Sequence, residues 1–259
     1  MFKRLAATAL FIALLGGGCA PGIDLTLGGA KNSKPAVPAW REVVPDMARY
    51  ECDRNTCGAR LIVYKFAKNK FSWRIENRAS PSTVQGWLKS LPDAAFVSNG
   101  VFFEEHWMPT GLLKTAGETL GGQKYEFAKS GLVELAPETK IIDTAAGDPG
   151  LAAMTEAAQS FPLLIKKGSR VAEFRDANAS RRTAIGADVD GNIYLASVPE
   201  DAVTFSEFAK LLADTAVKWD NVLNLDGGTS TGFAARAGDW SEAMNSIVQV
   251  PNVIVAKHR

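Results

Sequence analysis

Short apolar segments separated by polar linkers recur from about residue 60 to the end of the chain. Segments 60–66 and 71–75 have strand character, and the second alternates apolar with polar residues as a half-buried strand does. The four-residue linker 67–70 predicts that these two strands form a β-hairpin. The same pattern predicts strands at 94–97, 109–113, 181–186, 193–196, 222–225 and 247–256, with a second hairpin turn at 190–192. Pro251 predicts an edge or a bulge in the last strand.

Three segments instead repeat apolar residues at helical spacing. Segment 82–91 predicts a short helix ended by Pro92, and segment 151–159 has a helical pattern. Thr204 and Glu207 form a capping box in front of a third helix. The apolar residues of that helix are Phe205, Phe208, Leu211 and Leu212. Since 46% of the 259 residues are hydrophobic, we expect a single α+β domain with a mixed or antiparallel sheet packed by a few helices.

The first nineteen residues form a targeting segment, with two cations, an apolar run and a small-residue end. This segment resembles a bacterial lipoprotein signal, which implies that Cys19 is lipidated and that the protein is an outer-membrane lipoprotein of the cell envelope, facing the periplasm or the exterior. An ordinary secretory signal is the alternative. We expect residues 20–48, rich in Gly, Pro, Ala and Lys, to be a tether, and residues 49–259 to form the domain.

Cysteine and histidine usage limits the chemistry of this domain. Apart from Cys19, only Cys52 and Cys57 are present, and their spacing suits a small disulfide loop better than a metal pair. With two histidines in the chain, a multi-histidine metal centre is excluded. We predict no cofactor, while carboxylate-bound Ca²⁺ stays open. The net charge of +1 provides no long-range field for nucleic acid, so we expect contact with the membrane through the lipid anchor alone.

The most informative stretch is 222–233, where an aliphatic strand leads into Asp226, Gly227 and Gly228 and then into three hydroxyl side chains. Two glycines can adopt positive φ and leave backbone amides facing a ligand. A carboxylate, open amides and hydroxyls on one bend are suited to an anionic or polyhydroxylated substrate. A plain hairpin turn is the structural alternative.

Two further polar segments are candidates for the same site. Asn99 follows the apolar strand 94–97, and an Asn-Gly pair is also an ordinary turn signal. Arg181 and Arg182 form a pair that is either a solvated edge or, if the Arg182 fork turns inward, a phosphate contact. Segment 117–122 predicts a flexible loop that either covers a site or is ordinary surface.

Taken together, the polar blocks resemble a known family. In order they are 98–103, 109–112, 159–163, 182–186, 204–209 and 225–230. This order resembles the phosphodiester glycosidase-like family, and the resemblance covers roughly 96–256. It implies an enzyme that removes a sugar from a phosphodiester, acting on a phosphorylated glycan or another glycosyl phosphodiester. Phe161 and Thr229 stand where family members often have Gly, so the pocket is expected to differ in shape.

The chemistry of such a reaction suggests roles for the named residues. The leaving phosphate needs its charge neutralised, which we assign to Arg182 assisted by Gly227, Gly228 and Ser230. A carboxylate must direct water or attack the sugar, which we assign to Asp226. The other expected contacts are Asn99 with the sugar or phosphate, and Gln159, Ser160 and Thr229 in the pocket.

Two other functions remain open from the sequence. The first is a non-catalytic envelope lipoprotein that binds glycan or protein through the same cleft, because a fold resemblance does not establish activity. The second is a metal-dependent phosphodiesterase, which needs a carboxylate cluster that the sequence does not display. Possible second carboxylates are Glu104, Glu105 and Asp188.

Overall fold

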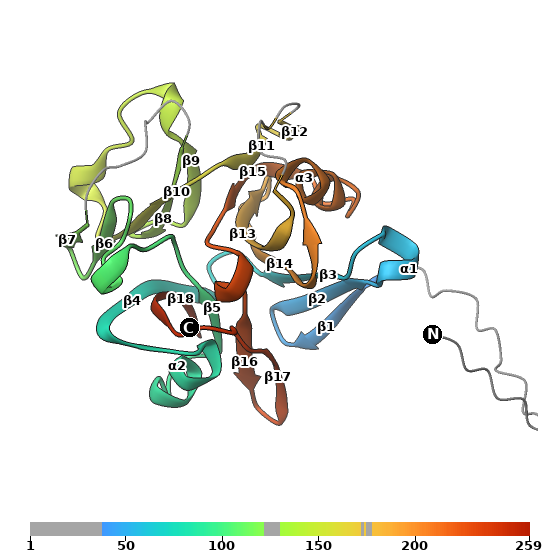
Figure 1. Ribbon diagram of the computed structural model, residues 1–259, viewed down its shortest axis with the longest axis horizontal. Helices are drawn as coiled ribbons and strands as arrows, with labels where there is room; N and C mark the ends of the chain where they lie inside the picture. Colours follow the sequence, from blue (N-terminus) through green and yellow to red (C-terminus); the bar gives the residue numbers. More distant parts are fainter. Residues whose placement is uncertain (1–37, 122–129, 172–173, 175–177) are drawn as a thin grey trace, which may run out of the picture. The chain divides into compact units, whose positions relative to one another are not determined.

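The computed structural model describes residues 38–121, 130–171, 174 and 178–259 (Figure 1). The predicted signal segment, Cys19 and most of the predicted tether therefore lie outside the described residues. Strands β1 (Trp40–Val44) and β2 (Met47–Cys52) pair antiparallel, so regular structure begins earlier than the predicted domain start at residue 49. Within the described residues, no helix combines the length and apolar character needed to cross a membrane.

The described strands form three antiparallel sheets. The first has the order β1-β2-β3 (Leu61–Phe66)-β14 (Ile193–Val203)-β13 (Ser180–Asp188)-β15 (Trp219–Asn224)-β11 (Leu163–Lys166)-β12 (Ser169–Arg170). The second has the order β7 (Glu118–Leu120)-β6 (Leu113–Thr115)-β10 (Glu156–Ser160)-β8 (Gly131–Ala136)-β9 (Lys140–Asp143). The third has the order β17 (Trp240–Met244)-β16 (Phe233–Ala237)-β5 (Phe96–Asn99)-β18 (Val250–His258)-β4 (Phe71–Ser82).

Helices are few and short. They are α1 (Arg54–Cys57), α2 (Val84–Ser90) and α3 (Phe205–Ala213), with 3-10 turns at Glu105–Trp107, Thr144–Ala146, Leu151–Ala153 and Gly228–Ser230. The predicted capping box begins α3, because the Thr204 hydroxyl accepts from the Glu207 amide while the Glu207 carboxylate accepts from the Thr204 amide. The expectation of antiparallel sheet with few helices is confirmed, but the protein is richer in strand than a balanced α+β domain.

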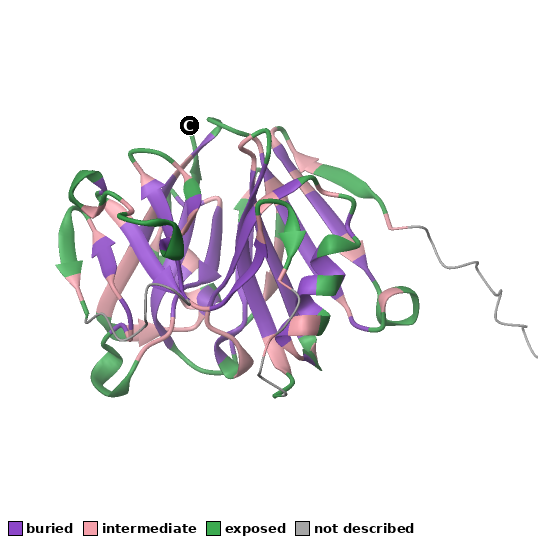
Figure 2. Cartoon of the chain, turned by 90° about the horizontal axis from the view of Figure 1, so that it is seen from above, coloured by how far each residue is buried: buried purple, intermediate pink, exposed green. Residues whose placement is uncertain are grey.

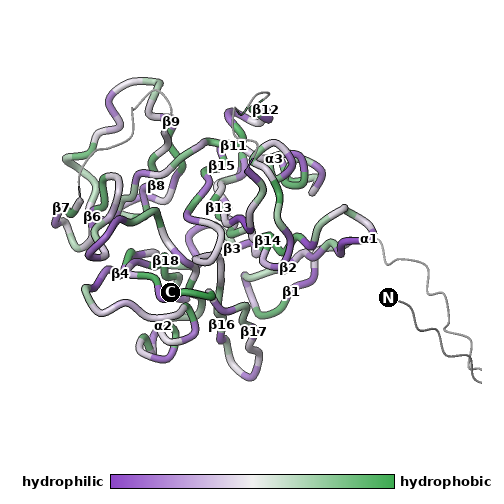
Figure 3. Tube along the Cα trace, in the orientation of Figure 1, coloured by the Kyte–Doolittle hydropathy of each residue, from purple (hydrophilic) through white to green (hydrophobic). Residues whose placement is uncertain are grey.

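One aromatic core joins the three sheets. Tyr64 and Phe66 from the first sheet meet Phe96 and Phe233 from the third in edge-on contacts, and Phe96 and Phe233 stack on each other. Leu113 adds a side chain from the second sheet. The inner strands are accordingly buried along most of their length, while the outermost strands of the sheets, the loops and the outer helix faces are more exposed (Figure 2). Hydrophobic and hydrophilic residues alternate over short stretches of the trace, as expected for strands buried piecewise (Figure 3).

Helices α3 and α2 each pack on a sheet face that lies outside the aromatic core. Helix α3 buries Phe208 and Leu212 against Leu164 and other residues of the first sheet. Helix α2 buries Val84 and Trp87 against the third sheet. These helices close the two faces that the aromatic core does not use.

Three sequence expectations are corrected. Strands β3 and β4 exist as predicted, but they lie in different sheets and do not form a hairpin, since β3 pairs with β2 and β14 and β4 pairs with β18. Segment 151–159 is a 3-10 turn followed by strand β10, not a helix. The predicted loop 117–122 contains strand β7, and its last residue lies outside the described part.

The misassigned strand β10 has a simple physical cause. Four of its five residues are buried, and it lies between β6 and β8 in the second sheet. A strand covered on both faces shows no alternation of apolar and polar residues, so its short apolar run mimics a helix. Pro251, by contrast, lies at a register shift between Val250 and Asn252, which confirms the predicted bulge.

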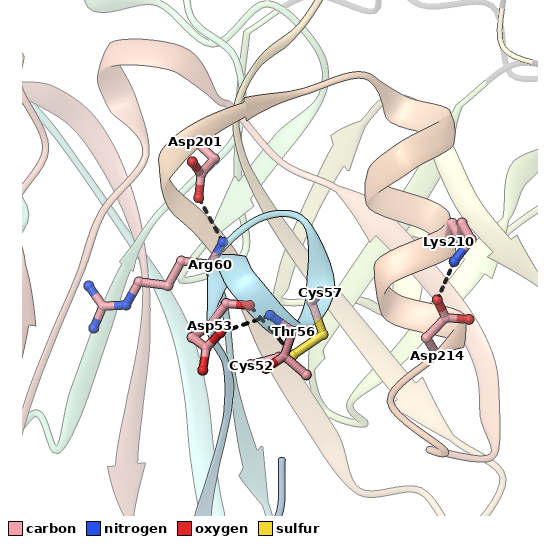
Figure 4. Close-up of a disulfide and its surroundings, with 8 residues drawn as sticks. All are labelled: Cys52, Asp53, Thr56, Cys57, Arg60, Asp201, Lys210 and Asp214. Atoms are coloured by element: carbon pink, nitrogen blue, oxygen red, sulfur yellow. Dashed lines mark hydrogen bonds and ion pairs between the residues drawn. A yellow bond between two sulfur atoms is a disulfide. The ribbon is translucent and has the colours of Figure 1, made fainter. Parts of the chain in front are cut away.

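The predicted disulfide is present between Cys52 and Cys57, with Cα atoms 6.0 Å apart (Figure 4). It closes the loop that contains α1, between strands β2 and β3. Asp53 caps α1 by accepting from the Thr56 amide at 2.9 Å. The disulfide therefore stiffens a loop that otherwise has only a one-turn helix.

A polar cluster links the first sheet to the third. The Glu242 carboxylate on β17 accepts two hydrogen bonds from Arg49 on β2, at 2.7 and 2.8 Å, and one from the Tyr64 hydroxyl on β3 at 2.5 Å. Burial, followed by the bond to Glu242, raises the pKa of Tyr64, so this hydroxyl stays protonated and donates. Glu242 satisfies two buried donors at once.

Replacing Glu242 should therefore destabilise the fold. Glu242→Ala leaves the buried Arg49 and Tyr64 donors without this acceptor, and we expect a loss of about 2–3 kcal/mol in the free energy of unfolding. Urea unfolding followed by tryptophan fluorescence measures it. The exposed neighbour gives a matched control, because Ser241→Ala should change stability by less than about 0.5 kcal/mol. Equal effects of the two substitutions would contradict a bridging role for Glu242.

Candidate active site at the end of strand β15

Strand β15 delivers Asp226 into a turn that two other segments hold in place. The Leu225 amide donates to the Thr183 carbonyl at 2.8 Å, and the Asp226 amide donates to the Gly100 carbonyl at 3.1 Å. The turn itself is the 3-10 segment Gly228–Ser230, which is orange-red in Figure 1. Asp226 is thus attached to the first sheet on one side and to the end of β5 on the other.

The Asp226 carboxyl is partly buried and has two local donors. The Gly227 amide donates to Oδ1 at 2.8 Å, and the Ser230 hydroxyl also hydrogen-bonds to the carboxyl. Burial raises the pKa of Asp226, and the bonds from Ser230 and Gly227 oppose this change in part. The Gly227 amide and the Ser230 hydroxyl, which the sequence assigns to the substrate, therefore serve the carboxylate here.

The side-chain amide of Asn99 anchors the turn through hydrogen bonds. Its Nδ2 donates to the Asp226 carbonyl at 2.8 Å and to the Gly100 carbonyl at 3.4 Å. Its Oδ1 accepts from the Thr183 hydroxyl at 2.9 Å and from the Gly232 amide at 3.2 Å. All four positions of this fully buried amide are occupied by protein. Asn99 is thus a positioning residue in this structure, not the sugar or phosphate contact that the sequence suggests.

A second buried amide, Asn252 on β18, supports the same region and was not identified from the sequence. Its Oδ1 accepts from the Val101 amide at 2.7 Å, and its Nδ2 donates to the Val101 carbonyl at 3.2 Å. A Cβ on Gly100 would lie 2.0 Å from Asn252 Oδ1, which explains the glycine. The available signal was an amide in the middle of an otherwise apolar final strand.

Arg182 lies across from Asp226 on strand β13. Ala184 pairs with Asn224, and continuing this register through the bond from Leu225 to Thr183 places Arg182 opposite Asp226. The Arg182 guanidinium, however, lies over the Phe205 ring at 3.9 Å and donates to backbone carbonyls, from Nε to Val203 at 3.0 Å. The backbones of Arg182 and Asp226 therefore lie opposite each other, but the Arg182 guanidinium is bound to Phe205 and Val203.

Arg181 contacts the turn directly, although the sequence analysis assigned it no role. Its Nε donates to the Gly228 carbonyl at 2.7 Å, and its Nη1 donates to the Pro199 carbonyl at 3.3 Å. A Cβ on Gly227 would lie 2.7 Å from the Arg181 carbonyl, so only glycine permits this close approach. Gly228 has φ of +59°, which also favours glycine.

Segment 199–203, whose carbonyls accept hydrogen bonds from Arg181 and Arg182, is itself held by contacts with residues 54–60. Asp201 on β14 accepts from the Arg60 amide at 2.7 Å (Figure 4). The Asp201 carboxylate also forms an ion pair with Arg54 in the disulfide loop. Pro199 and Val203, on either side of Asp201, provide the carbonyls bound by Arg181 and Arg182. The disulfide loop thus supports the arginine pair through one carboxylate.

The pocket residues from β10 differ in role. Gln159 donates to the Ser130 hydroxyl at 2.9 Å and accepts from the Leu112 amide at 3.2 Å, so it joins strands within the second sheet. Phe161, just after β10, has its ring centroid 6.5 Å from that of Phe205, and its carbonyl accepts from Asn224 at 2.8 Å. Phe161 therefore lies edge-on near the same Phe205 ring that the Arg182 guanidinium covers.

Unsatisfied polar atoms gather in the segments that meet at this turn. Among the described residues, four buried atoms without a hydrogen-bond partner belong to these segments: Ser160 Oγ, Arg181 Nη2, Asn224 Oδ1 and Thr231 Oγ1. Buried donors and acceptors of this kind are normally satisfied by protein, ordered water or a ligand.

Other predicted groups lie elsewhere or have no shown role. Asp188 accepts from Tyr194 and Asn192 at the far end of β13, opposite the start of β15, and is thus remote from Asp226. Thr229 is exposed. Within the described residues, no group of three or more His, Cys, Asp or Glu side chains could hold a metal ion. The described cavities, the most enclosed of about 360 Å³ beside Trp73 and Arg259, do not include Asp226.

The fold and this turn together define a β-rich domain with one partly buried carboxyl beside two arginines. The chain belongs to the phosphodiester glycosidase family, whose sequence model matches residues 93–257. This membership supports a hydrolase. No protein with curated annotation shows significant sequence similarity to the chain.

Two of the solved structures that share the fold illustrate the likeness. One is the catalytic domain of zebrafish N-acetylglucosamine-1-phosphodiester α-N-acetylglucosaminidase, auto-inhibited by its pro-peptide, with a TM-score of 0.61, 14% identity and coverage of 85% of each chain. The other is a hypothetical protein from Synechocystis, with a TM-score of 0.60 and 16% identity over 86% of this chain. The chain spans 64% of that Synechocystis protein. At these identities the likeness concerns the fold alone.

The raised pKa of Asp226 has a measurable consequence for stability. Because the folded state binds this proton more tightly than the unfolded state, the contribution is present below the ordinary value of 3.8 and is lost as pH rises through the raised folded value. Asp226→Asn removes the cost of burying the charge. The stability of this variant relative to wild type should therefore increase between pH 3 and pH 7, as measured by urea unfolding.

Ser230→Ala provides the matched control, because it keeps the carboxyl but removes a bond that favours its ionised form. This variant should lose more stability at pH 7 than at pH 3. A difference between Asp226→Asn and wild type that stays constant over this range would contradict an elevated pKa.

Proposed function

We propose that this protein hydrolyses a glycosyl phosphodiester, breaking the bond between the anomeric carbon and the phosphate oxygen. The observation that carries the proposal is the partly buried Asp226 carboxyl with its raised pKa, held by Asn99 beside a turn with unsatisfied polar groups. Membership of the phosphodiester glycosidase family supports the same reaction class. The zebrafish relative named above is an enzyme of this type by its description.

The chemistry needs one base and a stabilised anion. Water attacks the anomeric carbon, the phosphomonoester departs with the bridging oxygen, and Asp226 accepts the proton of the water. A carboxylate whose pKa lies above its usual range is a better base near neutral pH than an exposed one. A phosphomonoester is a good leaving group, so the reaction depends mainly on neutralising its charge, which the neighbouring arginines can do.

We also propose where the protein acts and on what. The lipoprotein-type segment 1–19 and the disulfide between Cys52 and Cys57 favour an envelope protein anchored through Cys19, since disulfides persist in oxidising compartments. The substrate would then be a phosphorylated glycan or another glycosyl phosphodiester of the envelope or the exterior. The mechanism requires no metal cofactor, because Asp226 and the arginines provide the charges.

A panel of sugar phosphodiesters with methyl or aryl aglycones tests the reaction. Wild type should release reducing sugar and phosphomonoester, and in ¹⁸O-labelled water the label should enter the sugar. Asp226→Asn should lower kcat about 10²–10⁴-fold because it removes the base. Excess EDTA should leave the rate unchanged.

Other results would redirect or reject the proposal. Label in the phosphate would show P–O cleavage, and sensitivity to EDTA would point to a metal-dependent phosphodiesterase. Binding without release of sugar would identify a binding protein instead. The anomer released first, read by NMR, separates a base from a nucleophile, since a base gives inversion and a nucleophile gives retention.

A further inference from the structure

Two neighbouring arginines reach the proposed site, and their surroundings differ. Arg182 donates from Nε to the Val203 carbonyl at 3.0 Å and from Nη2 to the Asn178 carbonyl at 2.5 Å. Its guanidinium also lies over the Phe205 ring at 3.9 Å. Arg182 is thus held by backbone and ring contacts, so it would have to exchange these to grip a substrate.

Arg181 uses two of its three guanidinium nitrogens. Its Nε donates to the Gly228 carbonyl at 2.7 Å and its Nη1 to the Pro199 carbonyl at 3.3 Å. Its Nη2 is buried and finds no acceptor among the described residues. In the same part of the chain, no carboxylate forms an ion pair with it, and desolvation accordingly lowers the pKa of Arg181.

A partly buried guanidinium with an unused donor and no counter-ion has lost hydration that no protein contact replaces. Leaving a buried donor unsatisfied is unfavourable, and a guanidinium N–H forms a strong charge-assisted hydrogen bond with a phosphate oxygen. The bond from Nε to Gly228 places this guanidinium against the turn that follows Asp226. Ser160, Asn224 and Thr231 add further unsatisfied buried atoms in the same segments, which is consistent with an absent polar ligand.

We propose that Arg181, rather than Arg182, binds the phosphate of the substrate. This inference rests on the proposed function for the identity of the ligand, while the anion site itself rests on the contacts of Arg181. Nη2 donates to a phosphate oxygen, and Nε stays on Gly228 to fix the distance between the phosphate and Asp226. Arg181 then selects charged phosphodiesters over neutral glycosides. Arg182 acts as a positioning residue that links β13 to the start of α3.

Binding of inorganic phosphate tests the anion site without requiring turnover. Wild type, Arg181→Gln and the control Lys210→Gln, an exposed cation on α3, are titrated by calorimetry at low ionic strength. Arg181→Gln should weaken phosphate binding about tenfold or more, and Lys210→Gln should leave it unchanged. Unchanged phosphate binding in folded Arg181→Gln, or absence of phosphate binding to wild type, would overturn the inference.

A second measurement tests the anion site if Arg181→Gln does not fold. In wild type labelled with ¹⁵N-arginine, the Arg181 Nε–H signal is assigned as the one missing in Arg181→Lys, and phosphate is added. This signal should shift with phosphate, and the corresponding signal of Arg182 should shift less. A larger shift at Arg182, or none at Arg181, would count against the assignment.

Turnover separates this inference from the proposed function. On a glycosyl phosphodiester, Arg181→Gln should raise KM about tenfold or more, with a smaller effect on a neutral aryl glycoside of the same sugar. Phosphate binding that depends on Arg181 in a protein without any glycosidase activity would retain the anion site and reject the proposed reaction. Turnover by wild type with equal KM in Arg181→Gln would retain the reaction and reject the role of Arg181.

Discussion

The structure around the proposed site depends on one buried amide. Asn99 binds the Asp226 carbonyl, the Gly232 amide and the Thr183 hydroxyl, and so joins the end of β5, both ends of the glycine turn and strand β13. Removing a fully satisfied buried amide would leave several backbone and hydroxyl groups without partners, which is far more costly than losing one exposed hydrogen bond. The position of the carboxyl is therefore set by the contact between sheets, not by the turn alone.

Around this amide the protein keeps opposite charges apart. Asp226 receives hydrogen bonds from Gly227 and Ser230 but from no arginine that the structure records, and Arg181 pairs with carbonyls but with no described carboxylate. Burial consequently moves both pKa values toward the neutral forms. A direct ion pair would remove this effect. Keeping the carboxylate of the turn and the guanidinium of β13 apart is what the proposed reaction needs, with one group as base and the other for the phosphate.

The periphery of the domain contributes to this arrangement. The disulfide loop reaches Asp201 through Arg54 and Arg60, and the segment 199–203 then binds both arginines of β13 through its carbonyls. The core polar cluster of Arg49, Tyr64 and Glu242 fixes the first sheet to the third. Since Asn99 and Asp226 come from different sheets, the alignment of those sheets decides whether they meet.

Local chemistry allowed much of the chain to be predicted. Alternating or aliphatic runs located most strands, the Thr204 capping box located α3, and the spacing of Cys52 and Cys57 indicated their disulfide. Such signals depend on neighbours in the sequence, which is why Asp226 at the end of its strand was also recognisable. The sequence could not predict which strands β3 and β4 pair with, or that Glu156–Ser160 is a strand. Nor could it predict the contacts made by Asn99, Arg181 and Asn252. Those features depend on which distant backbone carbonyl or amide faces each side chain, and burial by remote segments erases the periodicity that would reveal them.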